Sequence, residues 1–367
     1  MGNRKLRVGV IGCGSISDIY LQNMISEFGN LEVVACAAAH VENAVKKAEK
    51  YGIRGCTVEE LLADETIDMA VILTPAPTHY ELIRQALEAG KHVYTEKAMT
   101  ITTDTAAELV KLADEKGLYL GSAPDTFLGA SWQTARKMID EGKLGEITSF
   151  QISANRDLDV LAGLFGFLRM PGGGICYDYG VYYLTALVSL LGPVKRVAAS
   201  VRNRKEVRVN KVPQSPEYGQ AFSYPNESQV CAVVELESGV MGNFALNGDS
   251  VLGDQAMFAI YGTEGILRLT DPNQFGGQNT FMANYCDFSH TPVWEEVENV
   301  FPYAENSRGI GPAEMADAIL SGRKNRASKE MAYHVLDVVD TMMRSSGSGR
   351  FEEVGSTCER PEAMPDK

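Results

Sequence analysis

The feature that most constrains this chain is a short apolar segment that runs straight into two glycines. Leu6 to Ile11 is short, apolar and rich in β-branched residues, which predicts a buried strand. Gly12 and Gly14 follow at once, and Ser15 to Phe28 predicts a helix. In such a unit the first glycine permits a tight turn. The second lets the backbone approach a pyrophosphate group, which the first helical N–H groups face. The residues from Val8 to Ser17 therefore predict a dinucleotide-binding turn.

The same alternation of strand and helix continues as far as Ser122. Further strands are expected at 31–37, near 54, and at 69–73, 92–95 and 119–122, and further helices at 41–51, 57–63, 79–89 and 103–116. Thr57 with Glu60 has the pattern of a capping box at the start of one of these helices. A βαβ series predicts a parallel, doubly wound sheet of the Rossmann type with right-handed crossovers. We therefore expect an N-terminal α/β domain that covers residues 1–122.

The pattern changes after Pro124, where strands follow one another with less helix between them. Strands are expected at 147–153, 194–201, 229–237, 240–247, 256–262 and 266–269, and helices at 312–320 and 329–345. Ser238-Gly239 and Thr263-Glu264-Gly265 each separate two strands and predict antiparallel hairpins. The polar residues 350–367 are expected to be loosely held. Residues 123–367 therefore predict an α+β domain with a predominantly antiparallel open sheet.

Charge and cysteine content exclude several classes of protein. The chain of 367 residues carries a net charge of −14, which disfavours nucleic acid as a partner because phosphate contacts need a basic surface. The seven cysteines are scattered and form no C-x-x-C pair, so neither a disulfide framework nor a structural zinc site is expected. No cluster has the spacing of metal ligands, and no metal is expected. Reduced cysteines indicate a cytoplasmic protein.

No apolar segment approaches the length of about 18 residues that a membrane span needs, so no contact with a membrane is expected. Met1 to Lys5 has the charge of an export-signal start, but the apolar run behind it is short and is interrupted by glycines. We therefore assign that run to the first strand.

Three sets of residues follow one another along the chain. The first is the turn Gly12-Cys13-Gly14-Ser15-Ile16-Ser17, in which the small Ser17 replaces a third glycine. The second is Thr74-Pro75 with His79, followed by Ala89-Gly90-Lys91-His92-Val93 and Glu96-Lys97. The third is Gly172-Gly173-Gly174 with Asp178, Gly180 and Tyr182, and Arg308-Gly309 and a helix with His334 come later. In this order they resemble the signatures of the Gfo/Idh/MocA family of NAD(P)-dependent oxidoreductases, over nearly the whole chain.

The resemblance implies an enzyme with NAD or NADP as cofactor and with a second copy of the chain as partner, in a homodimer or homotetramer. The residues that it assigns to the cofactor are Gly12, Gly14, Ser15, Ile16, Ala38, Thr74, Pro75, His79, Glu96 and Lys97. The residues that it assigns to catalysis are Lys97, Asp178 and Tyr182. His79 fits a structural role as well as a cofactor contact, and His334 is expected to be structural.

The sequence departs from the usual pattern of the family at three single residues and in one run of three. Ala98 replaces the proline that usually follows the Glu-Lys pair, and Thr185 replaces an acidic residue. Tyr182 stands where most members have histidine, although members similar to glucose–fructose oxidoreductase and dimeric dihydrodiol dehydrogenase have tyrosine there. Ala37-Ala38-Ala39 stands where many members have an aspartate.

Ala38 bears on the choice between NAD and NADP. A ribose-binding acid is expected about 20 residues beyond the glycines, and Ala38 stands near that place. Without a carboxylate there, a 2′-phosphate meets no repulsion, and His40 is close enough in the sequence to contact it. No arginine is present to grip it in a bidentate way. We therefore expect NADP to be tolerated and leave the preference between the two cofactors open.

The chemistry of Lys97, Asp178 and Tyr182 is complementary. Lys97 follows the expected strand 92–95, where an open α/β sheet binds its ligand. Asp178 and Tyr182 are four residues apart, so they share one face of a helix. A tyrosine with a pKa of about 10 is a weak base at neutral pH, and a nearby ammonium group lowers that pKa. We expect Lys97 and Tyr182 to transfer a proton beside the nicotinamide, while Asp178 orients the substrate hydroxyl.

The resemblance implies hydride transfer between NAD(P) and a hydroxyl or carbonyl group of a sugar, a polyol or a cyclic dihydrodiol. The alternative is a regulatory protein of the same fold that senses NAD(P) without turnover. The trio of Lys97, Asp178 and Tyr182 favours the enzyme, because a sensor needs no acid–base group beside the nicotinamide.

Overall fold

The computed structural model describes residues 4–251, 256–285 and 291–365, and the chain divides into two compact units. Unit 1 comprises residues 1–125 and 306–333, and unit 2 comprises residues 126–305 and 334–367. The segment 306–333, which the sequence pattern placed in the C-terminal domain, packs with unit 1. The reason is a set of long-range contacts, in which Asn23 donates to the carbonyls of Asn306 and Arg308 and Asn30 donates to the carbonyl of Ala313. Where two independently folding domains would divide stays a prediction.

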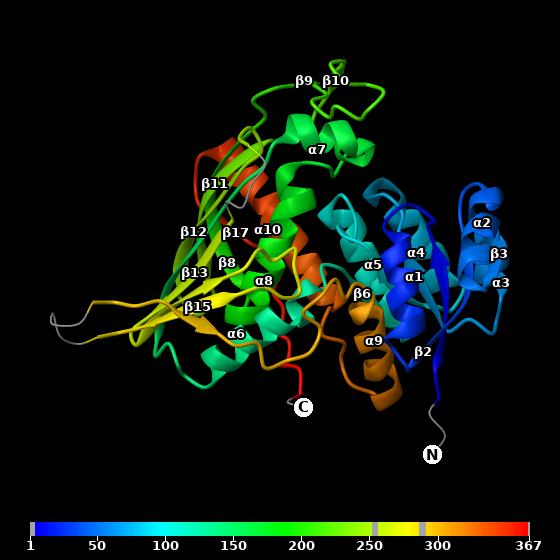
Figure 1. The fold of residues 1–367 in the computed structure, drawn as a ribbon, viewed down its shortest axis with the longest axis horizontal. Helices are drawn as coiled ribbons and strands as arrows, with labels where there is room; N and C mark the ends of the chain where they lie inside the picture. Colours follow the sequence, from blue (N-terminus) through cyan, green and yellow to red (C-terminus); the bar gives the residue numbers. More distant parts are fainter. Residues whose placement is uncertain (1–3, 252–255, 286–290, 366–367) are drawn as a thin grey trace. The chain divides into compact units, whose positions relative to one another are not determined.

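Unit 1 contains a six-stranded parallel sheet (Figure 1). Its strands are β1 (Leu6–Ile11), β2 (Leu31–Ala37), β3 (Arg54–Cys56), β4 (Met69–Ile72), β5 (His92–Thr95) and β6 (Leu120–Ser122). Their order is β3-β2-β1-β4-β5-β6, and all neighbours pair in parallel. This is the order of a doubly wound dinucleotide-binding fold, so the predicted sheet is confirmed. The loops after β1, β4 and β5 therefore emerge side by side at the carboxyl edge of the sheet.

The helices of unit 1 begin and end at signals that the sequence carries. They are α1 (Ser17–Ser26), α2 (Val41–Tyr51), α3 (Val58–Ala63), η1 (Ala76–Thr78), α4 (His79–Glu88), α5 (Thr103–Lys116) and α9 (Ile310–Ser321). Thr57 and Glu60 form the predicted capping box at the start of α3. Gly52 and Gly117 end α2 and α5 in the left-handed conformation, which glycine adopts without strain.

Unit 2 contains a nine-stranded mixed sheet. Its strands are β7 (Ile147–Asn155), β8 (Val194–Arg202), β11 (Gln229–Leu236), β12 (Met241–Asn247), β13 (Met257–Gly262), β14 (Gly265–Leu269), β15 (Asn279–Ala283), β16 (Glu295–Val297) and β17 (Glu352–Glu353). Only β7 and β12 pair in parallel among the described strands of this sheet, so the predicted antiparallel character is confirmed. Both predicted hairpins, β11–β12 and β13–β14, are present. A separate pair, β9 (Val207–Val209) and β10 (Ala221–Ser223), lies in the excursion between β8 and β11.

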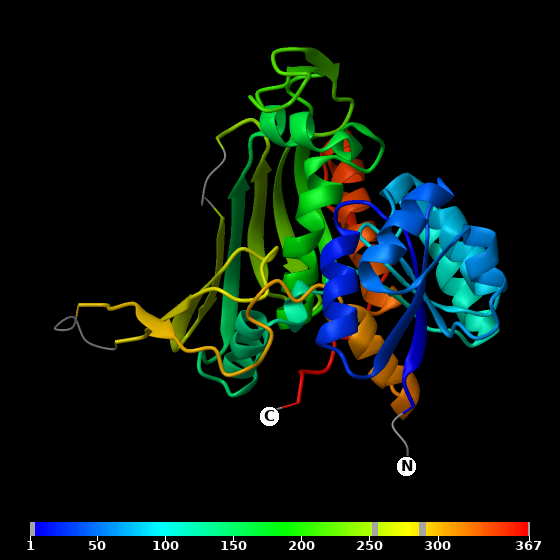
Figure 2. The ribbon, with the colours of Figure 1, turned by 45° about the vertical axis from the view of Figure 1, so that its right-hand side comes forward.

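The helical elements of unit 2 are η2 (Thr126–Leu128), α6 (Ala130–Asp140), α7 (Leu158–Leu164), η3 (Gly166–Arg169), η4 (Ile175–Gly180) and α8 (Val181–Leu191). Helix α10 (Lys329–Ser348) begins in unit 1 and ends in unit 2. Helices α8 (green) and α10 (red) lie on one side of the nine-stranded sheet, and among the described residues no helix covers its other side (Figure 2).

The C-terminal residues are held more firmly than their polarity suggested. Arg360 pairs with Asp140 at 2.8 Å, and the main-chain N–H of Met364 donates to Gln133. Strand β17 also pairs with β8, so the expectation of a loosely held tail was wrong. No helix in the described part of the chain is both long and apolar enough to cross a membrane.

Candidate functional site

The turn between β1 and α1 has the geometry that its glycines predict. Gly12 has a φ of 110°, and its N–H donates to the carbonyl of Ala37 at 2.8 Å. A Cβ atom on Gly12 would lie 2.8 Å from the carbonyl carbon of Leu73, so only glycine fits. A Cβ atom on Gly14 would meet nothing within 4 Å. The hydroxyl of Ser17, in place of a third glycine, donates to the carbonyl of Gly14 at 2.6 Å and fixes the turn.

The N-terminus of α1 is available to an anion. Ile16 occupies the N-cap position, and no side chain caps the helix. Asp18, in the first turn, is paired with Lys47 and Lys50 at 2.8 Å each, and these ammonium groups hold the pKa of the Asp18 carboxyl well below its usual range. The negative charge of Asp18 is therefore compensated, while Gly14 and Ser15 remain exposed beside the helix N-terminus. The residues of this turn fit a pyrophosphate group.

The carboxyl end of β2 borders a hollow of about 340 Å³. The residues that line the hollow are Ala38, Ala39, His40, Val41, Glu42, Thr57, Val58 and Glu59. Ala38 and His40, which the sequence pointed to for the ribose end of a cofactor, both take part. Glu42 and Glu59 were not foreseen, because they come from the helices that follow β2 and β3. The negative charges of Glu42 and Glu59 disfavour the binding of a phosphate group on the ribose at this hollow.

The loops after β4 and β5 are tied together by His79. This side chain is fully buried, and its two ring nitrogens lie 2.7 Å from the carbonyl oxygen of Thr74 and 2.8 Å from that of Ala98. Burial lowers the pKa of His79. His79 thus holds the segment with Thr74 and Pro75 against the segment with Lys97, which is a structural role, and its contact with a cofactor stays a prediction.

Glu96 fixes the main chain that carries Lys97. The hydroxyl of Tyr20, on α1, donates to one carboxylate oxygen of Glu96 at 2.7 Å, and the N–H of Lys97 donates to the other at 3.1 Å. Glu96 is 8% exposed, and these two donors account for its oxygens. Tyr20 was not singled out in the sequence, because an isolated tyrosine on an amphipathic helix predicts only core packing.

Asp178 and Tyr182 lie at a junction between two kinds of helix in unit 2. The segment η4 is π-helical and contains Asp178, and it continues directly into α8, whose second residue is Tyr182. A side chain at Gly173 would overlap the carbonyl of Leu168, and one at Gly174 would overlap the carboxylate of Glu227. The glycine run therefore brings the start of this helix against its neighbours. The sequence spacing predicted an ordinary α-helix here and missed the wider turn, since π-helical turns have no simple sequence signal.

The tyrosines around Tyr182 have structural contacts of their own. The hydroxyl of Tyr179 donates to Asp271 at 2.7 Å and lies 3.0 Å from the hydroxyl of Tyr183. The guanidinium of Arg156 stacks 3.9 Å from the centre of the Tyr179 ring and pairs with Asp271 at 2.8 Å. Tyr182 is 7% exposed and its ring packs beside Tyr179. Arg156 and Asp271 were missed because they come from strand ends that lie far apart in the sequence.

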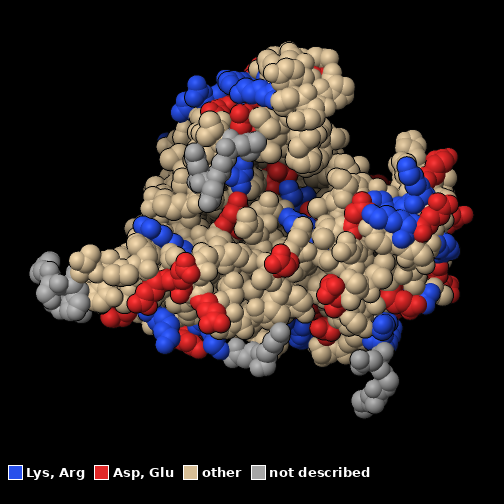
Figure 3. All heavy atoms as spheres, in the orientation of Figure 1, with Lys and Arg blue, Asp and Glu red and all other residues tan. Residues whose placement is uncertain are grey.

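Two other features concern metals and surface charge. No group of three or more His, Cys, Asp or Glu side chains suited to a metal ion occurs within residues 4–251, 256–285 and 291–365. On the face that Figure 3 shows, basic and acidic side chains are interspersed.

His334 is fully buried. Its Nε2 accepts a hydrogen bond from the N–H of Val194, in agreement with the structural role expected for it.

Two family models match this chain. A model described as an oxidoreductase family with an NAD-binding Rossmann fold matches residues 6–123, and a model of the GFO/IDH/MocA C-terminal domain matches residues 132–268. The first match ends within three residues of the end of the unit 1 segment at Asp125. Both models belong to the family that the three motifs resemble.

Known proteins similar to this chain include several dehydrogenases. scyllo-Inositol 2-dehydrogenase (NADP(+)) IolW of Bacillus subtilis is 28% identical over 56% of this chain and 58% of that protein. D-glucoside 3-dehydrogenase of Escherichia coli is 28% identical over 67% of this chain and 72% of that protein. A solved structure of levoglucosan dehydrogenase with NADH has a TM-score of 0.82 at 19% identity, and the match covers 96% of this chain and 100% of that one. At that identity the likeness shows the fold alone. The chain spans little more than half the length of the inositol dehydrogenase.

Proposed function

We propose that this chain, which belongs to the GFO/IDH/MocA family of oxidoreductases, transfers a hydride between NAD(P) and a hydroxyl or carbonyl group of a sugar, a polyol or a cyclic dihydrodiol. The observation that carries the proposal is the open glycine turn at an uncapped helix N-terminus, within a unit matched to an NAD-binding family. The relatives named for inositol and glucoside substrates support the substrate class.

The cofactor residues are assigned along the carboxyl edge of the sheet in unit 1. Gly12, Gly14, Ser15 and Ile16 hold the pyrophosphate, and Ala38 with its hollow receives the adenosine ribose. Thr74, Pro75, Glu96 and Lys97 serve the nicotinamide half, and His79 supports them by joining their loops. The strand order supports this assignment, because it places β1 between β2 and β4, with β5 next to β4. When bound, the cofactor supplies the hydride donor or acceptor.

The proton is handled by the side chains that the motifs assign. In the direction of oxidation, Tyr182 accepts the proton of the substrate hydroxyl, and the ammonium group of Lys97 lowers the pKa of that tyrosine. Asp178 accepts a hydrogen bond from a substrate hydroxyl and sets its orientation. The position of Asp178 and Tyr182 on consecutive helical turns of unit 2 supports a shared task for the two side chains.

The choice of cofactor is tested at the hollow beside Ala38. NADP tolerance remains our prediction, because no carboxylate stands at Ala38 itself. Glu42 and Glu59 oppose it, since they line the same hollow. Dissociation constants of NAD and NADP for the wild type and for a Glu59→Gln variant decide between these effects. The variant should bind NADP more tightly while its affinity for NAD changes less, and a strong preference for NAD in both proteins would contradict NADP tolerance.

The activity is tested with a substrate panel. Sugars, polyols and cyclic dihydrodiols are each incubated with the protein and either NAD or NADP, and nicotinamide absorbance is followed. Turnover of at least one polyhydroxylated compound is expected. Tight cofactor binding with no turnover over the whole panel would favour the alternative, a regulatory protein that senses NAD(P).

Two further properties belong to the same proposal. We propose a homodimer or homotetramer, supported by the uncovered side of the sheet in unit 2, where Val233 and Met241 are exposed. We also propose that the protein acts in the cytoplasm with a small polyhydroxylated substrate and without nucleic acid or membrane. This location is supported by the cysteines at 13, 36, 56, 176 and 231, which form no disulfide bond.

A further inference from the structure

Glu227 occupies the space that the glycine run leaves open. The main-chain carbonyl of Glu227 accepts from the N–H of Ile175 at 3.1 Å, and its carboxylate accepts from the N–H of Cys176 at 2.9 Å. Any side chain at Gly174 would collide with that carboxylate. Glu227, which lies outside the helix, therefore accepts hydrogen bonds from two of the first N–H groups of the segment that contains Asp178.

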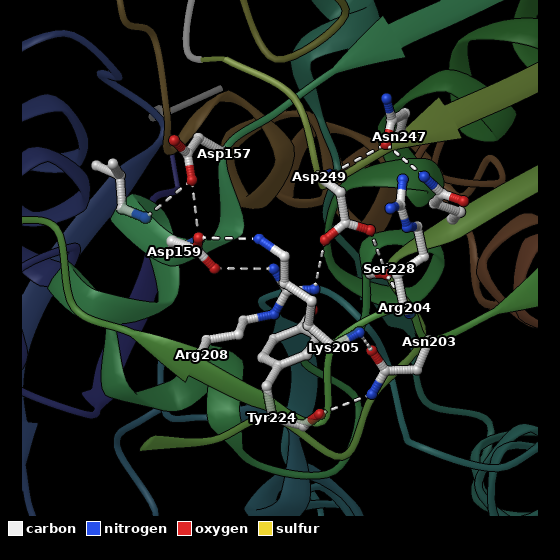
Figure 4. Close-up of polar contacts among 12 residues, drawn as sticks. Asp157, Asp159, Asn203, Arg204, Lys205, Arg208, Tyr224, Ser228, Asn247 and Asp249 are labelled. Atoms are coloured by element: carbon white, nitrogen blue, oxygen red, sulfur yellow. Dashed lines mark hydrogen bonds and ion pairs between the residues drawn. The ribbon is translucent and has the colours of Figure 1, made fainter. Parts of the chain in front are cut away.

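The part of the chain between β8 and β11, which contains Glu227, is held by a buried ionic cluster (Figure 4). Arg208, whose side chain is fully buried, pairs with Asp159 at 3.1 Å and with Asp249 at 2.9 Å. Its guanidinium lies 4.6 Å from the centre of the Tyr224 ring, and the hydroxyl of Tyr224 donates to the carbonyl of Gly173 at 3.1 Å. Tyr224 thus fixes the glycine run from the same segment, three residues before Glu227.

The carboxyl group of Glu227 lies among groups that disfavour its charge. Burial, with a smaller contribution from the Asp178 carboxylate, raises the pKa of Glu227 to about 7. The titratable groups that face it are Asp178, Cys176 and Tyr177 from η4 and Tyr224 from its own segment, and Arg208 lies behind Tyr224. The main-chain N–H groups of the helix start act in the opposite direction and favour the ionised form.

We propose that Glu227 is a positioning residue for Asp178, and that its ionised carboxylate holds the start of η4 in the geometry that binds substrate. The inference rests on the proposed function and adds a residue that none of the three motifs contains. A charged acceptor forms a stronger hydrogen bond with a helical N–H than a neutral one. Protonation of Glu227 therefore loosens the turn below Asp178 and raises the KM for substrate, while Lys97 and Tyr182 stay as they are.

The test compares Glu227→Gln with the wild type at pH 6 and at pH 8. Glutamine keeps an acceptor oxygen and loses the titration. We expect KM for substrate to fall about fivefold in the wild type between these pH values and to stay at the acidic value in Glu227→Gln, with kcat and cofactor affinity little changed. Glu227→Ala, which removes the acceptor, should have a raised KM at both pH values. Glu206→Gln, an exposed change of the same charge in the same excursion, is the matched control and should follow the wild type.

Thermal unfolding separates this role from a purely structural one. The folded pKa of Glu227 lies above the value of 4.5 for an unperturbed glutamate, so the folded chain holds the proton more tightly than the unfolded chain. The stability that this group contributes is full at low pH and is lost as pH rises toward 7. Glu227→Gln should therefore have the higher Tm at pH 8 and yet the poorer KM, whereas a structural role would change both in the same direction. A wild-type pH profile of KM in Glu227→Gln would overturn the inference alone, while absence of turnover in every protein would overturn the proposed function.

Discussion

A substitution of Gly14 gives the most direct test of the cofactor assignment. No atom lies within 4 Å of the place where its Cβ would stand, so a larger side chain there needs no rearrangement of the folded chain. The same side chain would fill the space proposed for the pyrophosphate. Gly14→Val should therefore fold normally and lose dinucleotide binding in a fluorescence or calorimetric titration. Unchanged binding by a folded Gly14→Val protein would remove the central assumption of the proposed function.

Tyr182 carries the proposed proton transfer. Positioned acid–base catalysis contributes about 10²–10⁴-fold to a rate, so Tyr182→Phe should lower kcat by about that factor with cofactor affinity intact. Lys97→Ala should lower the rate further, because the pKa of the tyrosine would rise, and Asp178→Asn should act mainly on the KM for substrate. Steady-state kinetics with the best compound of the panel measures all three. A near-normal kcat in Tyr182→Phe would move the proton transfer to Lys97.

Gly12 and Gly14 could be assigned from the sequence because a strand, two glycines and a helix follow one another within a few residues. The atoms that exclude a side chain at Gly12 belong to Leu73, which the sequence does not connect with it. Glu96 and His79 could be named from the family motif, but their partners could not, since Tyr20 lies 76 positions from Glu96. Glu227 carries no sequence signal, because its contact with Cys176 joins residues 51 positions apart.

Among the elements of unit 2, the excursion between β8 and β11 depends most on buried charge. Removing one partner of a buried ion pair leaves an uncompensated charge and costs about 3–5 kcal/mol. Arg208→Met, which keeps most of the volume, should lower the free energy of unfolding by about that amount in urea titrations. Arg204→Met, at an exposed position of the same excursion, should change it by less than about 0.5 kcal/mol. Equal stability of the two variants would show that the cluster around Arg208 does not hold the excursion.

The elements that sequence patterns predicted are those with a clear period or a stop signal. In unit 1 every predicted strand and helix is present, because buried parallel strands and glycine-ended helices are locally defined. The bounds of helix α8 could not be predicted from hydrophobic periodicity, because its residues from Val181 to Leu190 are all buried and show no polar face. Strands β9 and β10 have only three residues each, too few for an alternating pattern, and they are fixed by contacts such as those of Arg208.

At the scale of the whole molecule, the division of the chain is less simple than its sequence suggests. Residues 306–333 return to unit 1, where the N–H of Gly311, at the start of α9, donates to the buried carboxylate of Asp125 at 2.9 Å. The sequence patterns marked one boundary, at residue 122, and none at residue 306. The segment 306–333 is held in unit 1 by the side chains of Asn23 and Asn30, whose hydrogen bonds join residues nearly 300 positions apart in the sequence.

The uncovered side of the nine-stranded sheet makes the assembly of the molecule testable. Val233 and Met241 are 44% and 53% exposed, and the strand register places Val233 opposite Asn243 on one neighbour and Ala198 on the other. The carboxylate of Glu235, which lies opposite Met241 on the same face, is paired with Arg196 at 2.7 Å. Most oligomers of identical chains close symmetrically. Light scattering at micromolar concentration should give the mass of two or four chains.

A single charge in this surface should separate the copies. Val233→Asp would bury an unpaired carboxylate in the proposed interface, which is strongly unfavourable, and should shift the mass toward that of one chain while cofactor binding persists. Val207→Asp is the matched control, because Val207 is 66% exposed on β9, outside the nine-stranded sheet, and should leave the mass unchanged. A wild-type mass of one chain, or an unchanged oligomer in Val233→Asp, would show that this side of the sheet is not where two copies of the chain meet.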